Sequence, residues 1–263
     1  MIDLDLTKND INVLEKINDP ESDPARRVVV DDSLPKDPHV SDPETYHTVS
    51  SAERDIIRAI QTVEMQLARL QPHSLENSLG GYMDCVRKLD SLIDTYPNYA
   101  SARNNRAQAY RRLYGDVLLV HHTSDPRRLI QSPDEESVRA AAVVVLGDLD
   151  TAVDLLSPAT PSTPISPQNM KTLSAAHTQR ATIYHSTAKL LPSGSLTLPA
   201  TRREAGWSKM GFETAASQDF AMGGRYGSEV ARGLAVALNP TAKLCGQIVQ
   251  EAMKKEYGSA YQT

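Results

Sequence analysis

A run of small residues at helical spacing, ASARNNRAQAYRRLYGD at residues 100–116, most constrains how this chain can fold. Its alanines recur as they do on one surface of a helix, yet it holds almost no large apolar side chain that could build a core. Small side chains allow two helices to approach closely and to pack ridge into groove. The stretch therefore predicts a helix that crosses other helices at its alanines and presents amides and guanidinium groups elsewhere.

Apolar residues spaced three and four apart predict further helices along most of the chain. We expect them at residues 51–70, 76–95, 99–121, 132–156, 166–191 and 200–222, with two more that begin at Ser228 and at Asn239. Ser132 and Ser166 each precede a proline, which is typical of a helix start. Gly223 and Gly224 are expected to end the helix before them. No stretch alternates as a strand does, so the predicted fold class is all-α.

Composition argues against several classes of function. The chain has 263 residues and a net charge of −5, so no overall positive field favours nucleic acid or an anionic membrane. Its apolar runs are far shorter than the roughly 20 residues of a membrane span, and its first residues lack a signal-peptide pattern. Cys85 and Cys245 are the only cysteines, which argues against a disulfide scaffold. We therefore expect a cytosolic protein, with the nucleus as the alternative compartment.

Motifs that would carry chemistry are weak. His121, His122 and Asp125 offer metal-ligand atoms, but neighbouring helical residues point about 100° apart and no third ligand is suitably spaced. His177 and His185 share a helix face without a carboxylate in register, which favours packing or groove polarity. We expect no catalytic residue, no metal and no cofactor, and hence no enzyme.

The helix spacing is typical of tetratricopeptide repeats, in which two antiparallel helices of a 34-residue unit cross at small residues. Ala107 falls at the small crossing position and Tyr110 at the aromatic position of one such helix. Other helices carry matching positions, which are Cys85, Leu89, Leu92 and Pro97, then Val145, Leu149 and Ala152, then Ala181 and Tyr184, and finally Phe212 and Ala215. About three such pairs would stack into a right-handed superhelix with one extended concave wall.

Three stretches resemble the tetratricopeptide repeat protein 36 family, which has three repeats and a helical C-terminal cap. They are TKNDINVLEKINDP at residues 7–20, the stretch at 100–116, and GSEVARGLAVALNPTAKLC at 227–245. The LNP-x-A-x-x-C motif of the last stretch lies outside the general repeat pattern. The resemblance covers most of residues 1–20 and 50–256, and it implies a loose association with the regulation of tyrosine metabolism. Insertions lengthen the pairs at 71–77, 117–131, 157–166 and 188–203.

We divide the chain into three parts. Residues 1–48 hold a short helix at 9–17 and an acidic segment with four Asp-Pro steps, which disfavour helix and should lie extended along the body. Residues 49–222 hold the three helix pairs. Residues 223–263 hold capping helices, whose apolar side chains should cover the last pair. These side chains are Leu234, Val236, Leu238, Leu244, Ile248 and Val249.

The concave wall is the predicted binding surface. Amide side chains can bond the backbone of an extended peptide, and arginine can pair with a carboxylate. The candidate groove residues are Ser101, Asn104, Asn105, Gln108, Arg111, Arg112, Thr178, Thr182 and His185. We expect Arg111 to be exposed and to contribute little to folding. The predicted function is a monomeric adaptor or scaffold that binds a protein or peptide, with an acidic segment as one candidate.

Two alternatives stay open. Repeats that bind the acidic C-termini of the large heat-shock chaperones use a lysine and an arginine on the first helix of the third pair. Ala175 and Gln179 occupy those positions here, so a co-chaperone-like role ranks second. A helical enzyme or small-ligand binder would instead use Arg111, His185 and Glu204 in the groove.

Overall fold

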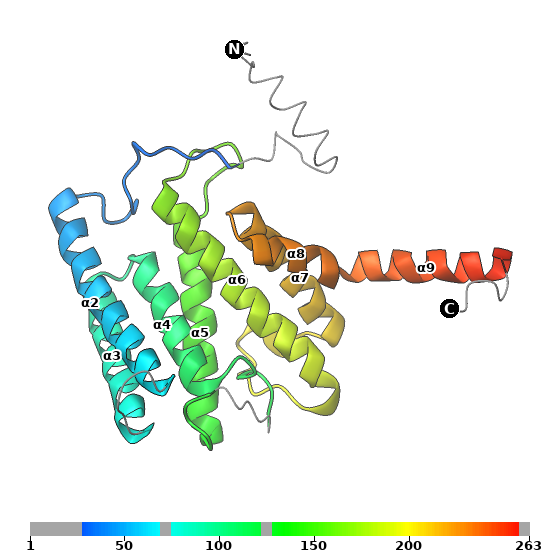
Figure 1. The fold of residues 1–263 in the computed structure, drawn as a ribbon, viewed down its shortest axis with the longest axis horizontal. Coiled ribbons are helices and arrows are strands. Elements are labelled where there is room, and N and C mark those ends of the chain that lie inside the picture. Colours follow the sequence, from blue (N-terminus) through cyan, green and yellow to red (C-terminus); the bar gives the residue numbers. More distant parts are fainter. Residues whose placement is uncertain (1–27, 69–74, 122–127, 258–263) are drawn as a thin grey trace, which may run out of the picture.

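The computed structural model describes residues 28–68, 75–121 and 128–257, and this part of the chain is helical without a β-sheet (Figure 1). Two isolated β-bridges, Val30 with Ile165 and Val120 with Leu196, are its only strand-like pairings. The predicted all-α class is confirmed. The α-helices are α2 (Pro43–Leu67), α3 (Leu75–Thr95), α4 (Ala100–Tyr114), α5 (Glu135–Leu156), α6 (Pro167–Leu190), α7 (Lys209–Arg225), α8 (Glu229–Leu238) and α9 (Pro240–Tyr257). Two short 3-10 helices, η2 (Leu191–Ser193) and η3 (Arg203–Gly206), lie between α6 and α7.

Consecutive helices pack on one another from α2 to α8, and α4 also contacts α6. Side-chain bonds join α2 to α4, for example Asn105 Nδ2 to Glu53 Oε1 at 2.7 Å. We call α2, α4 and α6 the inner helices. Figure 1 shows the whole set as a row that begins with α2 and α3 and ends with α7 and α8.

The core divides at α4. One cluster joins α2 with α3 and one side of α4, and its most enclosed members include Val49, Leu89 and Leu113. A second cluster joins the other side of α4 with α5, α6 and α7. Ala107 and Ala181 are fully buried, as expected for positions where helices cross closely.

The structure confirms two of the predicted helix starts. Ser166 caps α6 by accepting from the Asn169 amide, and Ser228 caps α8. The predicted start at Ser132 is wrong, because Asp134 is the residue that caps α5. Helix α2 begins at Pro43 after its cap Asp42, so the boundary predicted at residue 48 lies too late. The short helix predicted at 9–17 lies outside the described residues.

Two predicted helices have different limits in the structure. Helix α4 stops at Gly115, whose φ of 91° suits glycine, so residues 117–121 do not continue it. The helix predicted over 200–222 is instead the short η3 followed by α7.

Gly223 and Gly224 do not end α7, which runs on to Arg225. A Cβ atom at Gly223 would lie 2.5 Å from Oγ1 of Thr178 on α6, and one at Gly224 would lie 2.8 Å from Cα of Arg232 on α8. These glycines permit close contact between helices, and the predicted C-cap role is wrong.

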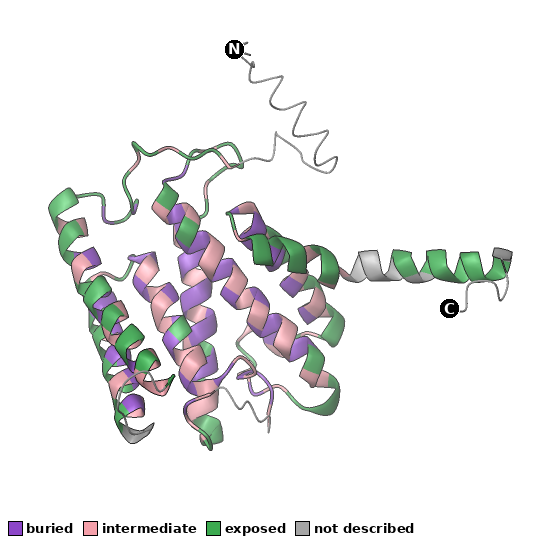
Figure 2. Ribbon diagram, viewed as in Figure 1, coloured by how far each residue is buried: buried purple, intermediate pink, exposed green. Residues whose placement is uncertain are grey.

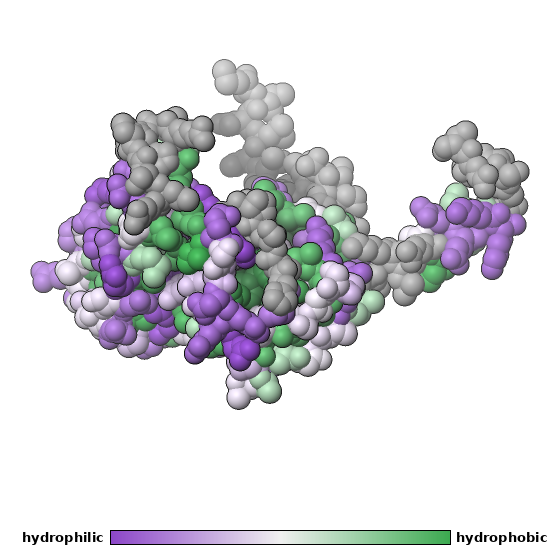
Figure 3. Space-filling view, turned by 90° about the horizontal axis from the view of Figure 1, so that it is seen from below, coloured by the Kyte–Doolittle hydropathy of each residue, from purple (hydrophilic) through white to green (hydrophobic). Residues whose placement is uncertain are grey.

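The predicted cap is formed by α8 alone. Ala231 of α8 is buried against Ala181 and Phe220, with Ala235 and Leu238 packed alongside. Helix α9 instead projects from the body (Figures 1 and 2). Figure 3 shows α9 clear of the body, with hydrophilic side chains over much of its described length.

Apolar side chains predicted to be covered by the cap are largely exposed. The exposed fractions are 68% for Val236, 57% for Ile248 and 56% for Val249. The prediction that both final helices cover the last pair is therefore wrong for α9. None of the described helices is both long and apolar enough to cross a membrane.

Residues 28–42, which we call the strap, cross one rim of the inner helices. The Asp31 amide donates to the Ile165 carbonyl at 3.0 Å, and the Ile165 amide donates to the Val29 carbonyl at 2.9 Å. His39 Nε2 lies 2.9 Å from the Leu155 carbonyl. The strap thus connects the α5–α6 loop to the start of α2, along the top of Figure 1.

Candidate functional site: a groove along the inner helices

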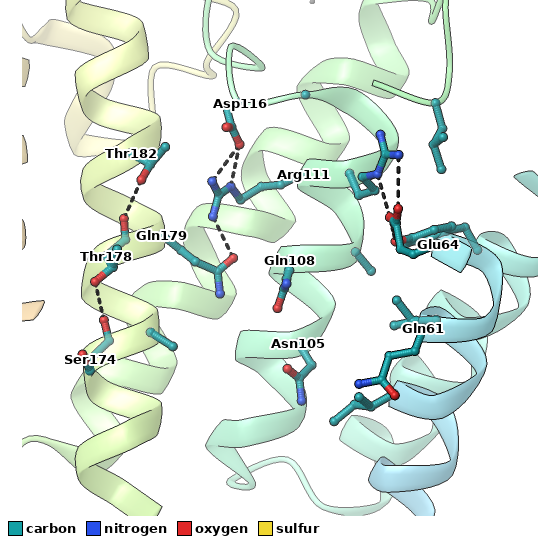
Figure 4. A pocket seen from close by; sticks show the side chains of 18 of the residues that line it. Gln61, Glu64, Asn105, Gln108, Arg111, Asp116, Ser174, Thr178, Gln179 and Thr182 are labelled. Atoms are coloured by element: carbon teal, nitrogen blue, oxygen red, sulfur yellow. Dashed lines mark hydrogen bonds and ion pairs between the residues drawn. The ribbon is translucent and has the colours of Figure 1, made fainter. Parts of the chain in front are cut away.

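Two adjoining cavities follow the inner helices. The groove cavity, of about 1810 Å³, lies between α2, α4 and α6 and is shown in Figure 4. The strap cavity, of about 1150 Å³, is lined by the strap and by the N-terminal parts of the inner helices. Because the two share lining residues from all three inner helices, they form one continuous concave surface. The shared residues are Ile57, Asn105, Gln108, Lys171 and Ala175.

Most of the predicted groove residues line these cavities. Asn105, Gln108, Arg111, Arg112, Thr178 and Thr182 line the groove cavity, and Ser101, Asn104, Asn105 and Gln108 line the strap cavity. His185 lines neither, so its predicted place in the groove is wrong. Gln108 is exposed and borders both cavities, which makes it the central polar side chain of the concave surface.

The two arginines predicted to receive a carboxylate already have partners within the chain. Arg111 Nε donates to Asp116 Oδ1 at 2.8 Å, and its Nη1 donates to Gln179 Oε1 at 3.0 Å (Figure 4). Arg112 Nε donates to Glu64 Oε1 at 2.7 Å. The Arg111 side chain is only 15% exposed, so the expectation of a free, exposed guanidinium is wrong.

Amide groups join α4 to α6 at the wall of the concave surface. Asn104 is buried, and its Oδ1 accepts from Gln179 Nε2 at 2.8 Å. Gln179 is itself buried, while Ala175 lines both cavities. Neither of the positions compared with the chaperone-tail clamp therefore supplies a cation.

The residues suggested for a helical enzyme are not brought together. Glu204 is fully buried, and its Oε1 accepts from Tyr184 Oη at 2.8 Å and from Arg202 Nη2 at 2.9 Å. Glu204 and His185 line neither cavity, whereas Arg111 faces the groove cavity. Among the described residues, no group of three or more His, Cys, Asp or Glu side chains could hold a metal ion. His122 and Asp125, weighed above as ligands with His121, lie outside those residues.

An arginine clasp joins three consecutive helices. Arg106 of α4 binds both oxygens of Asp148 on α5, through Nε and Nη2 at 2.7 Å each. Its remaining Nη1 donates to Asp90 of α3 at 2.7 Å. All three nitrogens of the Arg106 guanidinium therefore take part in holding α3, α4 and α5 together.

The same clasp recurs one helix pair later. Arg180 of α6 binds both oxygens of Asp219 on α7, through the same two nitrogens at 2.7 Å each. Its Nη1 donates to Asp150 of α5 at 2.7 Å. The arrangement of α3, α4 and α5 around Arg106 is thus repeated by α5, α6 and α7 around Arg180.

A third donor completes each clasp from the residue three positions earlier. Arg103 Nη1 donates to Asp148 Oδ1 at 3.1 Å, and His177 Nδ1 lies 2.8 Å from Asp219 Oδ1. Burial alone would raise the pKa of the Asp219 carboxyl, but the bonds from Arg180 and His177 outweigh it and lower that pKa. The statement that no carboxylate is in register with His177 is therefore wrong, since α7 provides one. His177 also stacks on Tyr226, whose ring borders the groove cavity.

Glu53 is a buried carboxylate that has no cationic partner among the described residues. Its Oε2 accepts from Tyr99 Oη at 2.6 Å, and its Oε1 accepts from Asn105 Nδ2. Burial raises the pKa of Glu53, and these hydrogen bonds offset only part of that effect. Glu53 borders the strap cavity. The wall of that cavity therefore includes one carboxyl group whose hydrogen-bond donors are uncharged.

Comparison with known proteins identifies one relative. The L-tyrosine degradation gene cluster protein hmgX of Aspergillus fumigatus (strain ATCC MYA-4609 / CBS 101355 / FGSC A1100 / Af293) is 34% identical to this chain over 258 residues. The matched region covers 95% of this chain and 93% of that protein. The chain belongs to the hmgX family. No family model matches it, and no solved structure does. The suggested membership in the tetratricopeptide repeat protein 36 family is therefore unsupported, although hmgX shares the link with tyrosine that this resemblance implied.

The clasps of this hmgX-family chain were not predicted from the sequence, although a short sequence pattern accompanies them. Arg106, Ala107 and Tyr110 share the pattern R-A-x-x-Y with Arg180, Ala181 and Tyr184. The pattern places an arginine beside the small crossing residue of two corresponding helices. The acids that complete each clasp come from other helices at unequal sequence distances, so sequence spacing alone does not identify them.

Proposed function

We propose that this hmgX-family protein is a non-enzymatic adaptor that binds an extended segment of another protein along its inner helices. In this proposal it acts as a monomer without cofactor or metal, in the cytosol or nucleus, and it takes part in L-tyrosine degradation. The observation that carries the proposal is the continuous concave surface of the groove cavity and the strap cavity. The relative's name supplies the link to tyrosine.

The size of the concave surface favours a peptide over a small molecule. Sites for small ligands usually enclose about 300–1,000 Å³, whereas the groove cavity alone measures about 1810 Å³. Of the polar groups that face it, Gln108 can both donate and accept hydrogen bonds, and Thr178, whose hydroxyl donates to the Ser174 carbonyl, can still accept one. An extended backbone presents alternating N–H and C=O groups that match such side chains.

The repeated clasp supports a solenoid of the tetratricopeptide type. Each clasp fixes an inner helix against the outer helices on both of its sides, so the inner helices form a regular row. In a solenoid, a row of this kind is the usual binding surface, because each repeat contributes one strip to it. On this interpretation α2–α3, α4–α5 and α6–α7 are the three helix pairs, and α8 is the cap.

Blocking the groove at its centre tests the proposal. Gln108→Trp would place an indole where the two cavities meet, while the exposed side chain at position 108 leaves the core undisturbed. Arg87→Trp on α3 is the matched control, since Arg87 is 72% exposed and lines neither cavity. Thermal unfolding should show that both variants are folded.

The functional measurement is growth on L-tyrosine as the sole carbon source in a host whose own copy of the gene is deleted. We expect the deletion to slow growth, and the unaltered chain and Arg87→Trp to restore it, while Gln108→Trp does not. Full restoration by Gln108→Trp would contradict binding along the groove. A deletion that leaves growth on tyrosine unchanged would contradict the role in tyrosine degradation.

A further inference from the structure

Three cationic side chains from three separate elements line the strap cavity. Lys36 belongs to the strap, Arg54 to α2 and Lys171 to α6, and all three are exposed. Within the described part of the chain, none of them forms an ion pair. Lys36 lies over the Tyr46 ring at 5.7 Å, and Arg54 Nε donates to the Ser50 carbonyl at 3.2 Å. The ammonium and guanidinium charges thus remain uncompensated at the cavity wall.

The arginines of the groove cavity, by contrast, already form ion pairs within the chain. The guanidinium groups of Arg111 and Arg112 are held by Asp116 and Glu64, as described above. A ligand carboxylate would have to displace those acids in order to pair with either arginine. The strap cavity requires no such exchange, so it is the better acceptor for negative charge.

Two of the inner helices add positive potential to the strap cavity. Pro43 and Pro167 are the first residues of α2 and α6, Ser101 is the second residue of α4, and all three line this cavity. The N-terminus of a helix carries a partial positive charge of roughly half a unit. The carboxylate of Asp42 caps α2 and offsets its positive end, so α4 and α6 are the helices that add positive potential to the space lined by the three cations.

Two acids also line the strap cavity and reduce this potential. Asp32 is exposed on the strap, and Glu53 is buried with its oxygens bonded to Tyr99 and Asn105. Three cations and the N-terminal ends of α4 and α6 outweigh these two carboxylates. The local charge is therefore positive in a chain whose net charge is −5.

We infer that the strap cavity binds an acidic peptide segment, whose carboxylates pair with Lys36, Arg54 and Lys171. This inference rests on the proposed function, because the same segment would continue from the strap cavity into the groove cavity. It replaces Arg111 and Arg112, which the sequence alone suggested, as the acceptors of negative charge. It also gives the unidentified partner a chemical class, namely a chain with clustered Asp or Glu residues.

Fluorescence anisotropy of the full chain with a fluorescein-labelled decaglutamate peptide tests the inference. A decaglutamine peptide of equal length is the uncharged control. We expect decaglutamate to bind more tightly at low salt and to weaken as salt rises, because exposed charges are screened over roughly 10 Å at 0.1 M. Single substitutions Lys36→Gln, Arg54→Gln and Lys171→Gln should each weaken binding about two- to fivefold, as exposed ion pairs usually do.

Matched variants separate local pairing from net charge. The triple variant Lys36→Gln, Arg54→Gln and Lys171→Gln should lower affinity at least tenfold. The control triple variant Arg58→Gln, Arg87→Gln and Lys209→Gln changes net charge equally, at exposed sites that line neither cavity. It should bind within about twofold of the unaltered chain, and so should Lys171→Arg, which retains the charge.

Several outcomes would overturn the inference. Equal losses in the two triple variants would show that only net charge matters, and equal affinity for decaglutamate and decaglutamine would show that acidity does not. Equal binding of an oligothymidylate of ten nucleotides, or displacement by free glutarate at similar concentration, would assign the site to another anion. If the triple variant keeps its affinity while Gln108→Trp loses it, the inference fails and binding along the groove stands. Undiminished binding by both the triple variant and Gln108→Trp would contradict the acidic-peptide inference and binding along the groove alike.

Discussion

Polar side chains on the inner helices are of two kinds, those bonded to neighbouring helices and those that face the open groove. Arg106 and Arg180 belong to the first kind, since each uses three nitrogens to hold two acids. Gln108 and Lys171 belong to the second kind, because both are exposed and line both cavities. A substitution of the first kind should change stability, and one of the second kind should change binding.

Arg111→Ala belongs to the first kind despite its place in the groove. The substitution would leave the Asp116 carboxylate and the Gln179 carbonyl without a donor that they now have. We expect the free energy of unfolding, measured in urea, to fall by about 1–3 kcal/mol. Arg58→Ala, at an exposed ion pair on α2, should change it by less than about 1 kcal/mol. Equal stability of Arg111→Ala and the unaltered chain would show that the guanidinium does not support the fold.

Glu53→Gln should alter how stability depends on pH. Burial raises the pKa of Glu53 above its ordinary value of 4.5. A carboxyl with a raised folded-state pKa contributes stability below its unfolded-state pKa, and this contribution is lost as pH rises through the folded-state value. Relative to Glu53→Gln, the unaltered chain should therefore lose stability as pH increases above about 4.5. Urea unfolding at a series of pH values measures this difference, and a constant difference would contradict the assignment. The negative charge of Asp37, whose own pKa burial also raises, contributes to the raised pKa of Glu53, so the measured difference includes the interaction between the two carboxyls.

At the scale of elements, helix caps that depend on neighbouring residues could be predicted from the sequence, whereas contacts between helices could not. Ser166 and Ser228 cap helices through amides three residues ahead, so their pattern is complete within a few residues. Gly223 and Gly224 resemble a helix end in the same local sense, yet their small size serves contacts with α6 and α8. The groove position of Gln108 follows from helix periodicity, whereas the pairing of Arg111 with Gln179 depends on a helix that begins more than 50 residues later.

Gly224→Ala tests the close contact between α7 and α8. The added Cβ would meet backbone and Cβ atoms of Arg232 at 2.8–2.9 Å, so the two helices would have to separate. We expect a loss of about 1–3 kcal/mol in the free energy of unfolding. Gly233→Ala on α8 is the control, because no atom lies within 4 Å of its added Cβ. It should be neutral or stabilising by up to about 1 kcal/mol, as for glycine in an exposed helix interior. Similar losses in the two variants would contradict a specific contact at Gly224.

At the scale of the whole molecule, the body from α2 to α8 should be stable without α9. Helix α9 leaves Ile248 and Val249 exposed, so its removal uncovers little apolar surface. A chain that ends at Leu238 should unfold cooperatively in urea with nearly the same midpoint as the full chain. A chain that ends at Tyr226 also loses α8 and uncovers Ala181 and Phe220, so its midpoint should fall clearly. Aggregation of the chain that ends at Leu238 would show that α9 covers the body after all.

The strap also decides how this molecule can deform. It ties the first inner helix to the loop before the third through paired backbone bonds at Ile165, so the two ends of the arc are joined at one rim. The arc cannot widen at that rim unless these bonds break. At the opposite rim, backbone bonds of His121 with Ser195 and of Thr197 with Leu119 join the loops after α4 and α6, whereas α2 is held to α4 by the Arg112–Glu64 ion pair. Opening of the arc is then a rotation of α2 away from α4 at that opposite rim, which widens the groove cavity while the strap cavity keeps its dimensions. A bound segment would therefore meet a strap cavity of fixed width and a groove cavity of adjustable width.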